Sequence, residues 1–155
     1  SDLPAAIARR VFLAFSVGWQ THPDLENDLS IVDIYQLAEL VLFPSLTEGR
    51  GLPIPEAAAA GIPIVCSEYD PPSVFAEVIG MHLPADQWIH YYDCPEGDFS
   101  DELLTTVATI LLDPDSQAAS IAHNRDVVRG RYSLDALTAT FGDVVRHIES
   151  SESSS

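Results

Sequence analysis

SLTEGRGLPIPEAAAAG, residues 45–61, is the most informative segment of this chain. It lies between two apolar runs, Leu40–Pro44 and Ile62–Cys66. Glycines and prolines fill its first half, and four alanines with a closing glycine fill its second half. This order predicts a strand, a glycine loop, a short helix and a second strand. Such a unit places backbone N–H groups and two carboxylates, Glu48 and Glu56, at the carboxyl edge of a parallel sheet, where α/β proteins bind ligands.

The bulk composition excludes several classes of partner. The chain has 155 residues, which suits one domain, and its formal net charge is −17 with no lysine. A basic face is needed to bind nucleic acid or an anionic membrane, so we expect neither partner. The longest nearly apolar run, Ala57–Cys66, is far shorter than the roughly 20 residues of a membrane-spanning helix. Cys66 and Cys94 show no paired metal or redox spacing, and we expect a reducing, cytoplasmic setting.

The rest of the chain alternates between strand-like and helix-like segments. We expect strands at Val11–Phe15, Leu40–Phe43, Ile62–Ser67 and Met81–Leu83. We expect helices at 30–38, from Pro53 to the four alanines, at Ser73–Ile79, at Ser100–Leu112, at Ser116–Arg129 and at Ser133–Ile148, with an irregular aromatic segment at Asp86–Phe99. This alternation predicts an α/β fold: a doubly wound parallel sheet with helices on both faces.

The motifs around the central stretch carry a family resemblance. The order Phe43-Pro44-Ser45, then Glu48-Gly49-Arg50-Gly51-Leu52-Pro53, Glu56-Ala57 and Gly61-Ile62-Pro63-Ile64-Val65 resembles the nucleotide-sugar lobe of retaining glycosyltransferases. These are the enzymes of family 4, also called glycosyl transferases group 1, which have the two-lobed GT-B fold. The resemblance is strong over residues 45–65 and looser from Val11 to Ile148. It implies a Rossmann-like lobe, truncated at its start.

The resemblance also implies roles for individual residues. Glu48 resembles a catalytic glutamate that faces the donor sugar and stabilises the positive charge that develops as the sugar–phosphate bond breaks. Glu56 resembles a second glutamate of the family, which accepts hydrogen bonds from both ribose hydroxyls. The alternatives are an ordinary loop glutamate at 48 and a solvated carboxylate at the positive end of a helix at 56.

The remaining donor contacts are expected between these two glutamates. Gly49 and Gly51 would let the backbone approach a ligand, unless they are turn glycines alone. The N–H groups of Gly51 and Leu52, next to Pro53 at a helix start, would face the sugar and diphosphate. Arg50 departs from the family pattern, and pairing with phosphate and exposure to solvent remain equal alternatives for it.

Other departures indicate an incomplete enzyme. The Arg and Lys with which the family grips the diphosphate are not recognisable, and the chain has no lysine. We therefore expect residues 1–148 to be a partial nucleotide-sugar-binding lobe, inactive by itself, of a longer hexosyltransferase that supplies an N-terminal acceptor lobe. Residues 149–155 are expected to form a disordered Ser/Glu tail. The donor would be a nucleoside-diphosphate sugar, and we expect no cofactor and no protein-bound metal.

Two other functions remain open from the residues. The fold could serve as a non-catalytic nucleotide-sugar-binding or regulatory module, because the lysine and the acceptor lobe are missing. A receiver-like signalling domain is a weaker alternative, since that fold needs a lysine after a late strand. A metal site at His90, Asp93 and Cys94 has no fourth ligand. The aromatic residues Trp88, Tyr91 and Tyr92 are better explained by packing than by stacking on a sugar.

Overall fold

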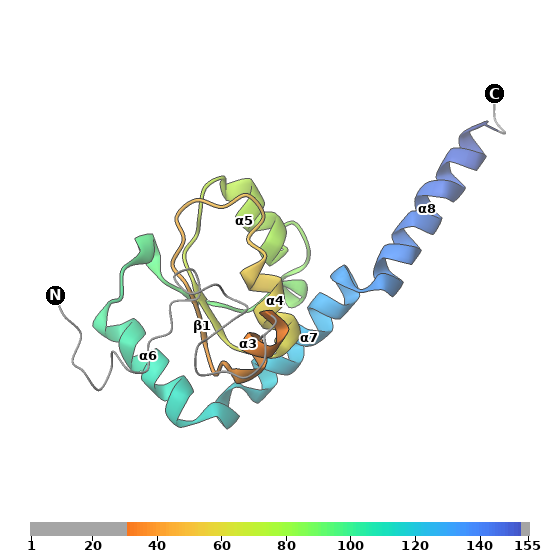
Figure 1. Cartoon of the computed structure of the whole chain (residues 1–155). Coiled ribbons are helices and arrows are strands. Elements are labelled where there is room, and N and C mark those ends of the chain that lie inside the picture. The colour runs from red at the N-terminus through yellow and green to blue at the C-terminus, as the bar shows by residue number, and fades with distance from the viewer. Residues whose placement is uncertain (1–30, 153–155) are drawn as a thin grey trace, which may run out of the picture. The chain divides into compact units, whose positions relative to one another are not determined.

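The structure is a computed structural model that describes residues 31–152, and from Glu39 on these residues form a parallel sheet flanked by helices (Figure 1). The sheet has the order β1–β2–β3, with β1 at Val41–Phe43, β2 at Ile64–Cys66 and β3 at Tyr92–Asp93. Val41 pairs with Ile64, and Val65 pairs with Tyr92. This architecture confirms the predicted α/β class. The predicted strand at 11–15, the residue Ser30 and residues 153–155 lie outside the described residues.

Helix α3, Ile31–Leu37, belongs to a separate compact unit that ends at Ala38. Asp33 stands in its first turn, where a carboxylate stabilises the positive end of a helix. None of its seven side chains is fully buried.

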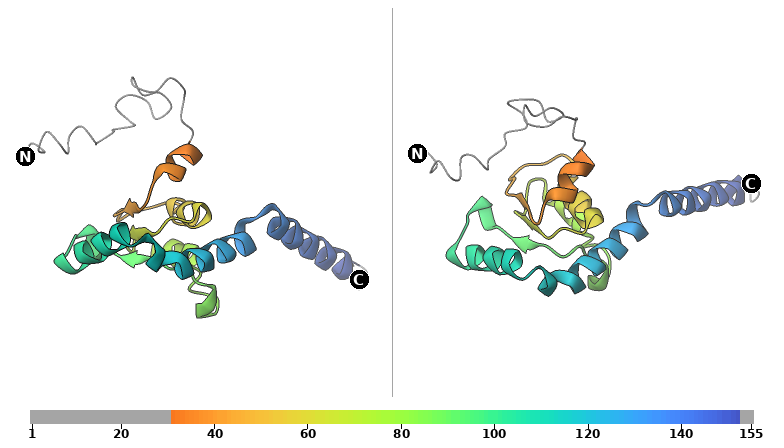
Figure 2. Two further views of the ribbon diagram at one scale, coloured as in Figure 1. Left: turned by 90° about the horizontal axis from the view of Figure 1, so that it is seen from below. Right: turned by 60° about the horizontal axis from the view of Figure 1, so that its bottom comes forward.

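Local sequence signals set the bounds of α4, Pro53–Ala60, as predicted. Pro53 starts the helix because its missing N–H costs nothing in the first turn. Gly61 ends it in the left-handed conformation with φ 76°, and Ile54, Ala57 and Ala58 are buried. Helix α4 contacts β1 and β2 and lies beside α7, Ala118–Tyr132 (Figures 1 and 2).

Both faces of the sheet contribute to the core. Val65 of β2 packs with Cys94 and with Leu103 of α6, Asp101–Leu112. Because strand side chains alternate, Ile64 and Cys66 point to the opposite face, and both are fully buried there. The Oγ atom of Ser100 accepts a hydrogen bond of 3.2 Å from the Leu103 N–H, which confirms the predicted start of α6.

Two arginines of α7 bind the carboxyl ends of two other helices. Arg125 donates to the Ala60 carbonyl at the end of α4 (3.0 Å). Arg131 donates to the carbonyls of Val78 (3.1 Å) and Ile79 (3.3 Å) at the end of α5, Pro72–Ile79. Last-turn carbonyls have no partner within their own helix, and they carry partial negative charge that a guanidinium neutralises. These contacts tie α7 to the helices that border the sheet.

Three predicted elements are wrong or shifted. Residues 81–83 are not a strand; the third strand is β3, within the segment predicted as irregular. Pairing with β2 creates it, since the Cys94 N–H donates to the Cys66 carbonyl (3.0 Å). Helix α5 begins at Pro72 without a side-chain cap, because proline suits the first helical position. The helix predicted from 116 begins at Ala118, after the 3₁₀ turn Pro114–Gln117.

The last helix, α8, spans Leu134–Glu152 and contains residues that were predicted to be a tail. The Oγ atom of Ser133 caps its start by accepting from the Ala136 N–H (3.1 Å). A nucleated helix extends at small cost, so it passes Ile148 and includes residues 149–152. Among residues 31–152, no helix is long and apolar enough to cross a membrane.

Candidate functional site

The segments that follow the strands meet at the carboxyl edge of the sheet. The segment after β1 pairs with the segment after β2, because the Glu48 N–H donates to the Asp70 carbonyl (2.9 Å) and the Asp70 N–H donates to the Leu46 carbonyl (3.0 Å). A parallel bridge joins Thr47 to Asp70. The backbone around Glu48 is therefore fixed as an extension of the sheet.

Glu48 is half-buried and held by a local hydrogen bond. The Ser45 hydroxyl donates to its Oε1 atom at 2.7 Å. The Ser45 hydroxyl also lies 3.2 Å from the Thr47 carbonyl. The side chain of Glu48 therefore has a defined place at the sheet edge.

Gly51 meets a tyrosine of the same chain where a ligand was expected. Its φ is +57°, a region that favours glycine. A Cβ atom built on Gly51 would stand 1.8 Å from the hydroxyl oxygen of Tyr69. The space freed by the absent side chain thus holds Tyr69, which by itself explains a glycine at this position. Gly49 has no atom within 4 Å of such a Cβ and is exposed.

The amino end of α4 presents the other predicted contacts. Leu52 precedes the helix without a side-chain cap and is 50% exposed. Glu56 lies in the first turn of α4, and its side chain is exposed. Pro53 and Pro55 carry no N–H and the Ile54 N–H donates to the Gly51 carbonyl (3.1 Å), so backbone donors toward a ligand at this end would come from the residues just before the helix.

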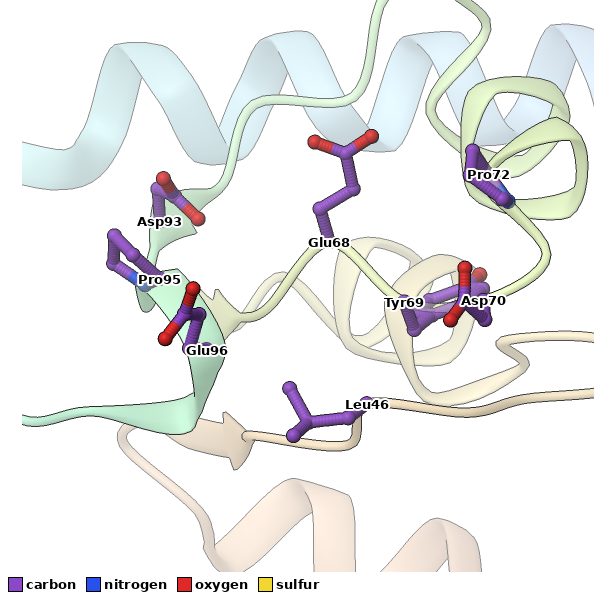
Figure 3. A pocket seen from close by; sticks show the side chains of 8 residues that line it. All are labelled: Leu46, Glu68, Tyr69, Asp70, Pro72, Asp93, Pro95 and Glu96. Carbon is purple, nitrogen blue, oxygen red and sulfur yellow. The ribbon is translucent and has the colours of Figure 1, made fainter.

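Two cavities lie in this region, and predicted site residues border only the smaller one. Gly49, Arg50 and Leu52 border a cavity of about 260 Å³ whose other walls are Pro55, Val74, Glu77, Val78 and Tyr132. A larger cavity of about 470 Å³ lies at the carboxyl ends of the strands, lined by Leu46, Glu68, Tyr69, Asp70, Pro72, Asp93, Pro95 and Glu96 (Figure 3). Neither Glu48 nor Glu56 lines either cavity.

Sequence reasoning missed the acidic lining of the larger cavity. Four of its eight residues are carboxylic acids, and no basic residue joins them. Glu68 and Asp70 lie two and four residues after the end of β2 at Cys66, so their place near the edge could have been read from the predicted strand. Asp93 and Glu96 could not, because β3 itself was not predicted. Close carboxylates repel an anionic ligand, so this cavity alone does not suit a diphosphate.

The residues weighed as metal ligands make other contacts. The His90 ring stacks on His123 with centroids 4.0 Å apart, and its Nδ1 lies 3.3 Å from the Ser120 hydroxyl. Burial, and next the neighbouring His123, lower the pKa of His90. The Cys94 thiol donates to the Asp98 carbonyl at 3.2 Å. Among residues 31–152, no group of three His, Cys, Asp or Glu side chains could hold a metal ion.

Comparison with known proteins adds two findings. The family model described as glycosyl transferases group 1 matches residues 12–113, more than half of the chain. The curated protein O-antigen chain mannosyltransferase B of Escherichia coli is 36% identical over 63 residues. That alignment covers 41% of this chain and 16% of the relative, so the chain spans only a small part of that protein's length.

Proposed function

The chain belongs to the family glycosyl transferases group 1, and from that membership we propose that it forms the donor-binding part of a retaining hexosyltransferase of family 4 with the GT-B fold. The enzyme would move a sugar from a nucleoside-diphosphate sugar to an acceptor hydroxyl. The observation that carries the proposal is the pair of glutamates at the sheet edge, one fixed by the paired segments after β1 and β2 and one in the first turn of α4.

In the proposed reaction, the bond between the anomeric carbon and the diphosphate oxygen breaks, and the electron pair leaves with the diphosphate. The acceptor oxygen forms the new bond on the same face of the sugar, and its proton passes to the departing phosphate oxygen. Positive charge develops on the sugar ring meanwhile. The Glu48 side chain, oriented by Ser45, would stabilise that charge without forming a bond to the sugar.

The second glutamate and the helix start would hold the nucleotide. Glu56 would accept hydrogen bonds from the two ribose hydroxyls, since a carboxylate has two acceptor oxygens. The N–H groups of Gly51 and Leu52, just before α4, and the exposed guanidinium of Arg50 would face the diphosphate. A relative named mannosyltransferase supports mannose as the first sugar to test.

Calorimetric titration tests the proposal. GDP-mannose, GDP, UDP-glucose and UDP would be titrated into the chain, and we expect weak binding of at least one because the net charge of −17 repels an anion. Glu56→Ala should weaken binding about tenfold or more, the effect of losing a hydrogen-bonded charged group. Glu102→Ala removes the same charge from the first turn of α6 and serves as the control.

Two outcomes would contradict the proposal. One is the absence of binding for all four compounds at millimolar concentration. The other is equal affinity of Glu56→Ala and Glu102→Ala.

A non-catalytic module is the second candidate, and the acidic cavity favours it. A transferase should lower the repulsion of a diphosphate near its reacting carbon, whereas four carboxylates raise it. The two candidates predict different results for hydrolysis of the donor: a transferase releases free sugar, and a non-catalytic module does not. If the chain binds a donor without releasing sugar above the rate in buffer, and the longer protein behaves in the same way, the module is the better description. Release that Glu48→Gln abolishes supports the transferase.

A further inference from the structure

The Tyr69 side chain is buried beneath the glycine loop with an unused hydroxyl. Its residue is 1% exposed, and its hydroxyl has no hydrogen-bond partner among the described residues. The ring is fixed by edge contacts to Phe43 (6.3 Å between centroids) and Phe75 (5.1 Å). The hydroxyl itself stands against Gly51, within the space of a side chain.

An unpartnered buried hydroxyl has an energetic cost. Leaving such a group without a hydrogen bond costs about 1–3 kcal/mol, and native proteins contain few of them. The aromatic contacts would be equally well made by phenylalanine, which lacks the hydroxyl. Packing therefore does not explain why a tyrosine stands at this position.

The Tyr69 hydroxyl and the Glu48 carboxyl group are a hydrogen-bond donor and an acceptor beside one loop. Burial, followed by the charges of Cys66 and Glu48, raises the pKa of Tyr69 to about 12. The phenol is therefore protonated at neutral pH and can donate. Glu48 lies one residue beyond the bridge that joins Thr47 to Asp70, the neighbour of Tyr69. In this structure its Oε1 atom accepts from Ser45, and a carboxylate has about four acceptor positions in all.

We propose that Tyr69 is a positioning residue of the donor site, whose hydroxyl donates a hydrogen bond to the Glu48 carboxylate once a nucleotide sugar occupies the glycine loop. This inference rests on the proposed function. The two groups flank the same loop, because the Tyr69 hydroxyl stands against Gly51 and Glu48 precedes Gly51 by three residues, and loop residues 49, 50 and 52 are exposed. The second hydrogen bond orients the carboxylate toward the positive charge that develops on the sugar and makes donor binding more favourable.

The test compares Tyr69→Phe with Tyr92→Phe. The Tyr92 hydroxyl donates to Gln117, so its removal breaks a hydrogen bond away from the loop. Donor affinity is measured by calorimetry, and the free energy of unfolding is measured by urea titration without ligand. We expect Tyr69→Phe to be at least as stable as the parent chain but to bind the donor about tenfold more weakly, as for a hydrogen bond to a charged group. Tyr92→Phe should be less stable and should bind the donor normally.

A cycle with Glu48→Ala, which removes both acceptor oxygens, identifies the partner of the hydroxyl. If Tyr69 acts through Glu48, the double variant binds no more weakly than Glu48→Ala alone. Additive losses would overturn the assignment of Glu48 as the acceptor. Equal donor affinity of Tyr69→Phe and the parent chain would overturn the positioning role while leaving the proposed function intact. Absence of donor binding to the parent chain would overturn both.

Discussion

Replacing Gly51 by alanine should strongly destabilise the fold. The residue has φ +57°, and an L-residue in this region costs about 1–2 kcal/mol. The new Cβ atom would stand 1.8 Å from the Tyr69 hydroxyl oxygen and 2.7 Å from the ring carbon that carries it. Tyr69 is fixed between two aromatic rings, so the overlap cannot be relieved by a rotamer change. Overpacking of this kind costs about 1–3 kcal/mol more, for a total of about 2–5 kcal/mol.

Gly49 provides the matched control for this measurement. It lies in the same loop, and a Cβ atom there meets nothing within 4 Å. Gly49→Ala should change the free energy of unfolding by less than about 1 kcal/mol. A small increase is compatible with this expectation, because alanine lowers the conformational entropy of the unfolded chain. Unfolding is followed in urea by circular dichroism, and the midpoints are compared at constant slope. In a Tyr69→Phe background, Gly51→Ala should recover part of its loss, because the closest atom is gone.

The reasoning would be refuted if Gly51→Ala unfolds within about 0.5 kcal/mol of the parent chain, the usual range for neutral surface changes. Equal losses for the two glycine variants would refute it as well. That result would mean that neither the positive φ nor the contact with Tyr69 determines the residue at position 51.

Three further predictions test other parts of the molecule. Arg131→Ala should lower the free energy of unfolding by about 1–3 kcal/mol, because it leaves carbonyls at the end of α5 unpaired, whereas Arg146→Ala on exposed α8 should change it by less than 0.5 kcal/mol in the same urea titration. The free energy of unfolding should fall as the pH drops from 7 to 5.5, because the pKa of His90 is lowered in the folded chain and the unfolded chain therefore binds the proton more readily. His90→Gln should flatten this dependence on pH, and an unchanged slope would show that His90 does not cause it. Cys66 should resist iodoacetamide at pH 8 in the folded chain and react in urea, because burial is the largest of the effects that raise its pKa to about 12; rapid alkylation of the folded protein, located by mass spectrometry, would be incompatible with this environment.

Sequence reasoning succeeded where the signals are local. The bounds of α4 follow from Pro53, the alanines and Gly61, each of which acts within one helical turn. The start of α6 follows from Ser100, whose side chain reaches an N–H three residues later. The parallel class of the sheet follows from the alternation of strands and helices.

Sequence reasoning failed where distant segments create the structure. Strand β3 has two residues, too few for a periodic pattern, and it exists because it pairs with β2. The glycine loop shows the same contrast between local signals and contacts with distant segments. The sequence predicted a glycine loop between Glu48 and Glu56, but Gly51 contacts Tyr69, which is eighteen positions away in the chain and adjacent only after the sheet forms.

The α/β class, the strand–loop–helix unit of residues 45–61 and the family can be read from the amino-acid sequence, because these depend on spacing and on residues close in the chain. Which residues share the sheet edge follows from the packing of distant segments. Parallel pairing brings Glu48 to Asp70 and places four carboxylates around one cavity, and it sets the hydroxyl of Tyr69 beneath Gly51. These contacts depend on packing between segments far apart in the chain, where side-chain shape and burial outweigh local preference.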